Sequence, residues 1–224
     1  LVKVLPPLLK PGTWIVTLQN GLGNEEWLAQ TFGTDRVLGG LCFVCLNRKQ
    51  PAVVEHLGYG QITLGDYARF PRPFVHDLCF HFRSCGVPCR PVANLFAARW
   101  EKLAWNIPFN GLCIAAGGVP VSAVLADAAL SARARVLMEE VVAGGRACGC
   151  FLPASLPSTL MERTKAMGDY RPSSLIDYEA GRSLELESIW VEPLRRARAA
   201  GLELPALAGL CEELRAKESK RREA

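Results

Sequence analysis

The chain has 224 residues, of which 50% are hydrophobic and 21% are charged, and its formal net charge is +4. This composition is typical of an ordinary globular protein that buries a substantial core in one large domain or two smaller ones. Much of the positive charge lies in residues 215–224, which we expect to form a solvated helix end. No interleaving of basic and aromatic residues predicts a nucleic-acid surface, and no apolar run is long enough to predict a membrane span.

The cysteines indicate the compartment and weigh against a metal site. There are nine of them, an odd number, and no secretory signal precedes them, which predicts a reduced, cytoplasmic protein. Cys42 and Cys45 form a C-x-x-C pair, but they lie in the apolar run VLGGLCFVCL without a second pair or a histidine pair nearby. We therefore interpret them as buried thiols, and we predict no metal site.

The N-terminal part, residues 1–92, mixes strand and helix patterns. Residues 1–12 look like the end of a helix, TWIVTLQ has the content of a buried strand, and NGLGNEEWLAQTFG predicts a helix that ends at Gly33. Three further strands are predicted from RVLGGLCFVCL, AVVEH and QITLG, and a helix from PFVHDLCFHFRSCG. We predict an α/β domain. Because the chain starts without an initiator methionine, we also expect that its natural N-terminus is absent.

Strand patterns stop at Asn94, and helix patterns fill the remaining chain. They are NLFAARWEKLAWNIPFNGLCIAAGG, SAVLADAALSARARVLMEEVVAGGRACG, SLPSTLMERTKAMG and SLELESIWVEPLRRARAAG. Pro91 interrupts any continuous helix between the two parts, so we place the domain boundary there. The predicted organisation is an α/β domain over residues 1–92 and an all-α domain over residues 93–224.

An α/β part followed by a helical part suggests a dinucleotide enzyme, so the glycines matter. Gly21, Gly23 and Glu26 give G-x-G-x-x-E between a strand and a helix, which lacks the third glycine of the dinucleotide fingerprint. Gly58 and Gly60 precede a strand instead of a helix. Both glycine pairs are therefore interpreted as turns, and we expect any phosphate loop to belong to the absent N-terminal part.

Several motifs are spread over almost the whole chain. They are LQNGLGNEE, VLGG, GQITLG, WEKLAWNIPFNG and RPSSLIDYEAGRSLELESIWVEPLRRARAAGLELP. In this order they resemble the ketopantoate reductase (2-dehydropantoate 2-reductase) family of the 6-phosphogluconate dehydrogenase-like group. The resemblance implies the C-terminal remainder of a Rossmann-type NADP-binding domain, without its first βαβ unit, followed by a helical domain for substrate binding, catalysis and dimerisation. It also implies NADPH-dependent reduction of ketopantoate or a related 2-oxo acid to the 2-hydroxy acid in pantothenate biosynthesis, in the cleft between the domains.

The helix pattern of WEKLAWNIPFNG carries a polar stripe. Lys102, Asn106 and Asn110 are four positions apart, so on a helix they share one face, whereas their neighbours are apolar. The resemblance assigns Lys102 to the family's catalytic lysine and both asparagines to substrate binding. A lysine is suited to this role because its ammonium can stabilise the developing oxyanion and deliver a proton. The alternative is a satisfied polar contact in the helical core.

Three further residues come from the resemblance. It assigns Asn20 to a place beside the nicotinamide and the substrate, Ser173 to substrate binding and Glu185 to catalysis. A register shift of one or two residues would select Ser174 or Glu187 instead. The residues themselves leave alternatives open: a turn signal at Asn20, a helix N-cap at either serine, and a solvated first-turn glutamate at Glu185.

Two prolines depart from the family pattern. Pro108 lies between the two asparagines and predicts a kink, and Pro120 stands near the place of a further family asparagine. The expected substrate is therefore ketopantoate or a bulkier branched 2-oxo acid.

Two functional hypotheses follow. The first is an NADPH-dependent reductase, which would form a homodimer through its helical domain. The second is a non-catalytic helical binding or dimerisation module on a degenerate α/β remnant. The presence of Lys102, Asn106, Asn20 and Glu185 favours the reductase, whereas the lack of a glycine-rich loop favours the module.

Overall fold

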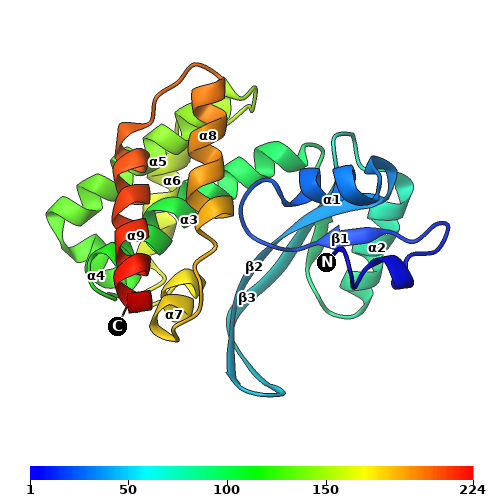
Figure 1. The fold of residues 1–224 in the computed structure, drawn as a ribbon, viewed down its shortest axis with the longest axis horizontal. Coiled ribbons are helices and arrows are strands. Elements are labelled where there is room, and N and C mark those ends of the chain that lie inside the picture. Colours follow the sequence, from blue (N-terminus) through cyan, green and yellow to red (C-terminus); the bar gives the residue numbers. More distant parts are fainter. Residues whose placement is uncertain (224) are drawn as a thin grey trace. The chain divides into compact units, whose positions relative to one another are not determined.

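The computed structural model describes residues 1–223, without the side chains of residues 47, 48, 57, 222 and 223. The chain forms two compact units, Leu1–Ala98 and Arg99–Ala224, and we describe each by itself. Unit 1 is α/β and unit 2 is helical (Figure 1). Within the described part of the chain, no helix combines the length and the apolar character that a bilayer span requires.

Unit 1 is built on a mixed sheet. Over the described residues its order is β1-β2-β3-β4, with β1 (Ile15–Thr17) parallel to β2 (Val37–Gln50), β2 antiparallel to β3 (Val53–Asp66), and β3 parallel to β4 (Cys89–Pro91). The two parallel pairs need crossover connections, which contain α1 (Asn24–Phe32), the 3-10 helix η2 (Thr34–Arg36) and α2 (Pro73–Ser84). The predicted α/β architecture is confirmed. The helix end predicted for residues 1–12 is wrong, because these residues form turns and a 3-10 helix, η1 (Pro6–Leu8).

A long hairpin replaces the three separate strands predicted from the sequence. β2 and β3 are each 14 residues long, and the turn between them is formed by Pro51 and Ala52. The glycine pair that we interpreted as a turn lies inside β3, where the register shifts opposite Phe43 and Val44, and Tyr59 has a φ of 59°. An extra residue in one strand is a β-bulge, which bends the strand without ending it. The hairpin therefore continues past β1 and β4 as a two-stranded arm (Figure 1).

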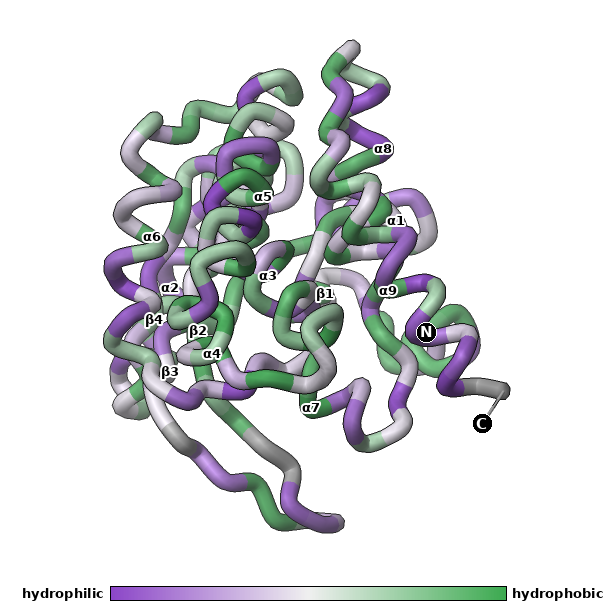
Figure 2. The backbone as a smooth tube through the Cα atoms, turned by 90° about the vertical axis from the view of Figure 1, so that its left-hand side faces the viewer, coloured by the Kyte–Doolittle hydropathy of each residue, from purple (hydrophilic) through white to green (hydrophobic). Residues whose placement is uncertain are grey.

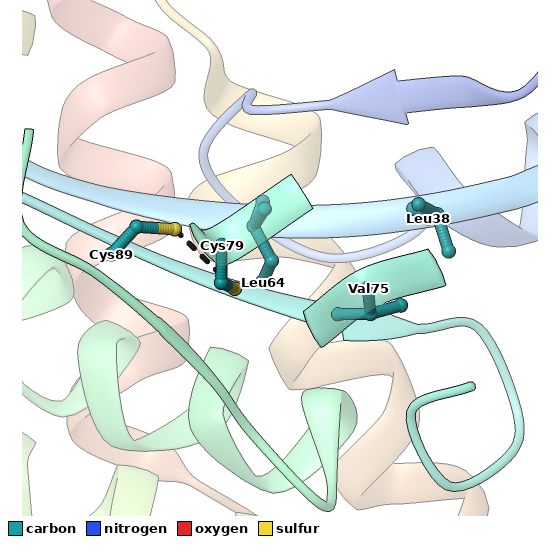
Figure 3. Close-up of a cluster of buried hydrophobic side chains, with 5 residues drawn as sticks. All are labelled: Leu38, Leu64, Val75, Cys79 and Cys89. Carbon is teal, nitrogen blue, oxygen red and sulfur yellow. Dashed lines mark hydrogen bonds between the residues drawn. The ribbon is translucent and has the colours of Figure 1, made fainter. Parts of the chain in front are cut away.

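One face of the sheet packs against α2. Figure 3 shows a cluster that joins β2, β3, α2 and β4, made of Leu38, Leu64, Val75, Cys79 and Cys89. The Cys89 thiol donates a hydrogen bond to Cys79 Sγ at 3.5 Å. Burial, and then this contact, raises the pKa of Cys89 to about 12, so its thiol is protonated at neutral pH. A second cluster joins β1, β2 and α1 and contains Ile15, Leu28, Ala29 and Val37.

Unit 2 contains helices and their connections, which confirms the all-α prediction for this part. Its elements are α3 (Leu95–Ala115, begun in unit 1), α4 (Val121–Ala126), α5 (Ala128–Ala147), α6 (Leu156–Lys165), α7 (Ser173–Glu179), the π-helix η3 (Glu187–Val191), α8 (Glu192–Ala199) and α9 (Pro205–Glu223). Asp127 separates α4 from α5, because its carboxylate accepts a hydrogen bond from the Leu130 amide at 2.9 Å and caps α5.

The core of unit 2 forms around α3. Trp100 and Phe109 on α3 and Trp190 on η3 are among its largest fully buried side chains. Glycine allows α5 to approach α3 closely, because a Cβ atom on Gly145 would lie 3.2 Å from the Trp100 ring. In Figure 2, α9 changes from hydrophobic to hydrophilic colouring toward its C-terminal end.

Candidate active site

The polar stripe lies on the most buried helix of unit 2. α3 runs from Leu95 to Ala115 through Pro108, so Lys102, Asn106 and Asn110 follow one another at one-turn intervals on one face. The predicted burial of this helix is confirmed, since five of its apolar residues are at most 1% exposed: Trp100, Leu103, Ala104, Ile107 and Phe109. Trp105, in contrast, is half-buried. Lys102 is half-buried, whereas both asparagines are buried. The stripe therefore begins at the half-buried Lys102 and continues to the buried amides of Asn106 and Asn110.

Asn110, at the buried end of the stripe, is hydrogen-bonded to α7. Asn110 Nδ2 donates a hydrogen bond to Ser174 Oγ at 3.0 Å, and both side chains are buried. Asn110 Oδ1 is buried without a hydrogen-bond partner among the described residues. At 2% exposure, Asn110 has little surface in this structure, and its direct contact with a substrate stays a prediction. Its hydrogen bond to Ser174 also fits the alternative of a core contact, in which one acceptor still lacks a donor among the described residues.

The two serines of α7 have different environments. Ser174 is buried against Asn110, whereas Ser173, the first residue of the helix, is exposed. Neither serine caps α7, because the N-cap residue is Pro172 and no side chain closes the first turn. The N-cap interpretation of the serines is therefore wrong. Of the two hydroxyls, that of Ser173 is accessible to a ligand.

The chain leading into α7 is fixed to the loops that follow α3. The Val121 amide donates to the Tyr170 carbonyl at 3.0 Å, and Arg171 donates to the Gly118 carbonyl at 3.2 Å. Arg171 also forms an ion pair with Glu179, at the other end of α7. These contacts hold α7 in register with α3, so the Asn110–Ser174 pair joins two elements that are already held together.

Glu185 stands just before the π-helix and is half-buried. Its carbonyl accepts a hydrogen bond from the Ile189 amide at 3.1 Å, so its backbone joins the first turn of the following helix. The Trp190 indole of that helix donates to the Ile107 carbonyl of α3 at 3.0 Å. Gly111 makes room for this contact, because a Cβ there would lie 3.0 Å from Trp190 Nε1 and 2.7 Å from Leu210 Cδ2. The helix after Glu185 is thereby anchored on the helix that carries Lys102.

Two contacts that support this site do not follow from the sequence patterns. The Trp190 indole donates to the Ile107 carbonyl, and the Trp105 indole donates to Thr164 Oγ1 at 2.9 Å. A buried indole usually has a hydrogen-bond partner, which is the signal that could have identified both as anchors. Their acceptors are distant in sequence and could not be named.

Asn20 belongs to unit 1, unlike the other predicted site residues. It follows β1 and precedes α1, and its carbonyl accepts a hydrogen bond from Asn24 Nδ2 at 2.9 Å. Gly21 and Gly23 next to it have φ values of 87° and 92°, which a side chain would disfavour. The local backbone is thus a glycine turn after a strand of a partly parallel sheet, the kind of place where open α/β sheets bind ligands.

Known proteins resemble this chain over both units. A family model described as ketopantoate reductase PanE/ApbA C terminal matches residues 94–218, and one described as ketopantoate reductase PanE/ApbA matches residues 1–69. The chain belongs to the ketopantoate reductase family. The resemblance inferred from the motifs is therefore confirmed, and with it an oxidoreductase family. A 2-dehydropantoate 2-reductase of Nostoc sp. is 37% identical over 220 residues, which are 96% of this chain and 69% of that relative.

Solved structures agree with this assignment to the ketopantoate reductase family. The crystal structure of 2-dehydropantoate 2-reductase from Geobacter metallireducens is 43% identical with a TM-score of 0.92, over 95% of this chain and 71% of that one. A ternary structure of D-mandelate dehydrogenase with NADH and anilino(oxo)acetate has a TM-score of 0.90 at 18% identity, over 99% of this chain and 72% of that one. At this identity, the second likeness shows the fold alone.

Proposed function

We propose that the protein reduces 2-dehydropantoate, or a related branched 2-oxo acid, to the 2-hydroxy acid with NADPH. Membership of the ketopantoate reductase family and the name of the Nostoc relative support this proposal. NADH in the D-mandelate dehydrogenase structure supports a nicotinamide cofactor. The observation that carries the proposal is the half-buried Lys102 at the accessible end of a polar stripe on an apolar helix.

Lys102 is proposed as the acid of the reaction. When bound, the reduced nicotinamide supplies a hydride to the carbonyl carbon of the substrate. Negative charge then grows on the carbonyl oxygen, where the Lys102 ammonium stabilises it and donates a proton to form the hydroxyl. Asn20 fits a place beside the nicotinamide because it follows the carboxyl end of a strand, in a glycine turn.

The remaining residues are proposed to hold the acid. Asn106 lies one turn beyond Lys102, and its amide can donate to a carboxylate without adding a charge. Ser173 offers an exposed hydroxyl, and Glu185 a carboxylate that accepts a hydrogen bond from a substrate hydroxyl. Asn110 is proposed to act on the substrate indirectly, by holding α7 through Ser174.

The experiment is a turnover assay on the complete gene product that carries this sequence. We would measure NADPH and NADH consumption with ketopantoate and a panel of other 2-oxo acids, for the unchanged protein and Lys102→Ala. Loss of a positioned general acid is expected to lower kcat by about a hundredfold or more, with the Kd for NADPH unchanged. The matched control is Lys165→Ala, because Lys165 is exposed and pairs with Glu162 at the surface.

Two outcomes would contradict the proposal. Unchanged turnover in Lys102→Ala would remove Lys102 from the reaction. Bound NADPH without turnover of any acid would favour the non-catalytic binding module. We also propose that the protein is cytoplasmic, which the free thiols of the described cysteines support. We propose in addition that it forms a homodimer through its helical unit. Light scattering of the same preparation tests the dimer.

A further inference from the structure

The segment that leads from α7 to Glu185 has little regular structure of its own. Residues 180–185 form a turn and then a stretch that is neither helix nor strand, between α7 and the helix at Leu186. Irregular segments are usually more mobile than the helices they connect. A carboxylate that must meet a substrate needs a fixed position, because a displacement of about 1 Å can lower a rate by about a hundredfold. The Glu185 carbonyl is held by the Ile189 amide of the following helix, and contacts from α9 hold the residues before Glu185.

Glu218 on α9 holds the residue directly before Glu185. The Leu184 amide donates a hydrogen bond to Glu218 Oε1 at 3.2 Å, and both residues are buried. Glu218 is only 8% exposed, which is unusual for a carboxylate and requires hydrogen-bonded or ionic partners. This contact fixes the backbone one peptide away from Glu185.

Arg221, one turn further along α9, holds the start of the same segment. Its Nη1 donates to the Tyr178 carbonyl at 2.6 Å and its Nη2 to the Arg182 carbonyl at 2.7 Å. Its guanidinium also stacks over the Tyr178 ring, 4.8 Å from the ring centroid, and lies 3.8 Å from the Glu218 carboxylate. The planar fork of arginine can reach two carbonyls at once, whereas a lysine ammonium cannot reproduce this geometry.

We propose that Glu218 and Arg221 are positioning residues that set the place of Glu185 in the active site. The two side chains come from one face of α9, three residues apart, and bind backbone atoms at residues 178, 182 and 184. We call these two side chains of α9, Glu218 and Arg221, the clamp on residues 178–184. This inference rests on the proposed function, because it concerns the carboxylate that the reductase would use.

The first test measures the clamp without turnover. We would follow amide hydrogen exchange in the complete gene product for Glu218→Ala, Glu218→Gln and Arg221→Lys. Glu218→Ala and Arg221→Lys are expected to speed exchange over residues 178–185 by about tenfold or more, with no change in α5. Glu218→Gln keeps an acceptor oxygen and is expected to preserve most of the protection. Glu212→Ala and Arg215→Lys are matched controls, because these residues lie on exposed positions of the same helix.

The second test asks whether the clamp acts through Glu185. Glu218→Ala is expected to lower kcat about tenfold, with rescue by Glu218→Gln and an unchanged KM for NADPH. In a Glu185→Gln background, where the carboxylate is already lost, the same substitution should change kcat by less than about twofold. A merely structural role would give the same loss in both backgrounds.

The outcomes of the two tests either support or overturn the inference. Faster exchange together with a kcat loss that disappears in the Glu185→Gln background supports the inference. Equal losses in both backgrounds, or protection that Glu218→Ala leaves unchanged, overturn the inference while the proposed function stands. No turnover in the unchanged protein overturns the proposed function and the inference with it.

Discussion

Asn110 and Ser174 form a buried hydrogen bond of 3.0 Å that joins two helices across 64 residues of sequence. The amide donates and the hydroxyl accepts, while the amide oxygen is buried without a partner among the described residues. A buried polar group without a partner raises the free energy of the folded state. The hydrogen bond between the two side chains stabilises the arrangement of α3 and α7. Asn110 Oδ1, in contrast, still requires a hydrogen-bond donor.

Removing either member of this pair should destabilise the protein. We expect Asn110→Ala and Ser174→Ala each to lower the free energy of unfolding by about 1–3 kcal/mol, and the double variant to cost less than their sum. Ser173→Ala is the control, since this serine is exposed and should change stability by at most about 0.5 kcal/mol. Urea unfolding of these four variants and of the unchanged protein tests this. Additive losses would show that the two side chains are not coupled.

Gly111 should not tolerate even a methyl group. Gly111→Ala would place a Cβ 2.7 Å from Leu210 Cδ2 and 3.0 Å from Trp190 Nε1, so we expect a loss of about 1–3 kcal/mol. The control is Gly209→Ala in α9, where a Cβ meets nothing within 4 Å and alanine should add up to about 1 kcal/mol through helix propensity. Thermal melts with opposite shifts are expected. A gain in stability for both variants would disprove the close contact.

The Asp66 carboxylate is fully buried and should be essential to the end of β3. It accepts hydrogen bonds from the Arg72 amide at 2.8 Å and from the Arg72 guanidinium, which also stacks over Trp14 at 4.2 Å. We expect Asp66→Asn to lower the free energy of unfolding by about 2 kcal/mol or more, because it removes the charge partner of Arg72. The matched control is Asp35→Asn, whose surface ion pair with Arg69 should contribute less than about 1 kcal/mol. Equal effects in denaturant titrations would contradict this contrast.

Stability should fall in alkaline solution because buried thiols resist ionisation. Burial raises the pKa of Cys113 from 9.0 to about 12 in the folded protein. Between these values the unfolded chain loses the thiol proton while the folded chain keeps it, so stability is full below pH 9 and falls as the pH rises toward 12. At pH 10 the loss is about 1.4 kcal/mol for this thiol.

The measurement compares urea unfolding at pH 8 and pH 10. Cys113→Ala should remove its share of the decrease, whatever its effect on stability at pH 8. An unchanged difference between the two pH values in this variant would mean that Cys113 ionises with a normal pKa.

The sequence was most informative where residue spacing matches a helix. The apolar and polar positions around Lys102 predicted a buried α3 with a polar stripe, because helical periodicity is local information. The long hairpin was missed for the opposite reason. Gly58 and Gly60 are typical of a turn, yet they lie inside β3, where Gly60 is the extra residue of a bulge. Tertiary pairing overrode this signal.

The residues of the candidate site could be predicted from the sequence, but the contacts between them could not. Family motifs gave Lys102, Asn106 and Glu185 their proposed roles, whereas the choice between Ser173 and Ser174 needed burial and contacts. Glu218 and Arg221 belong to a charged helix end that the composition predicts to be solvated. Their contacts with residues 178–184 depend on long-range packing, which no local pattern encodes.

The length of the β2–β3 hairpin also sets an order in which the sheet can assemble. Pairing starts beside the turn at Gln50 and Val53 and ends at Leu38 and Asp66, so each new pair forms next to an existing one. Such zippering closes only small loops and has a low entropic cost. The parallel pairs with β1 and β4 each enclose a crossover helix and have a higher contact order. The hairpin therefore closes at a lower entropic cost than the two parallel pairs, and we expect it to form before β1 and β4 join the sheet.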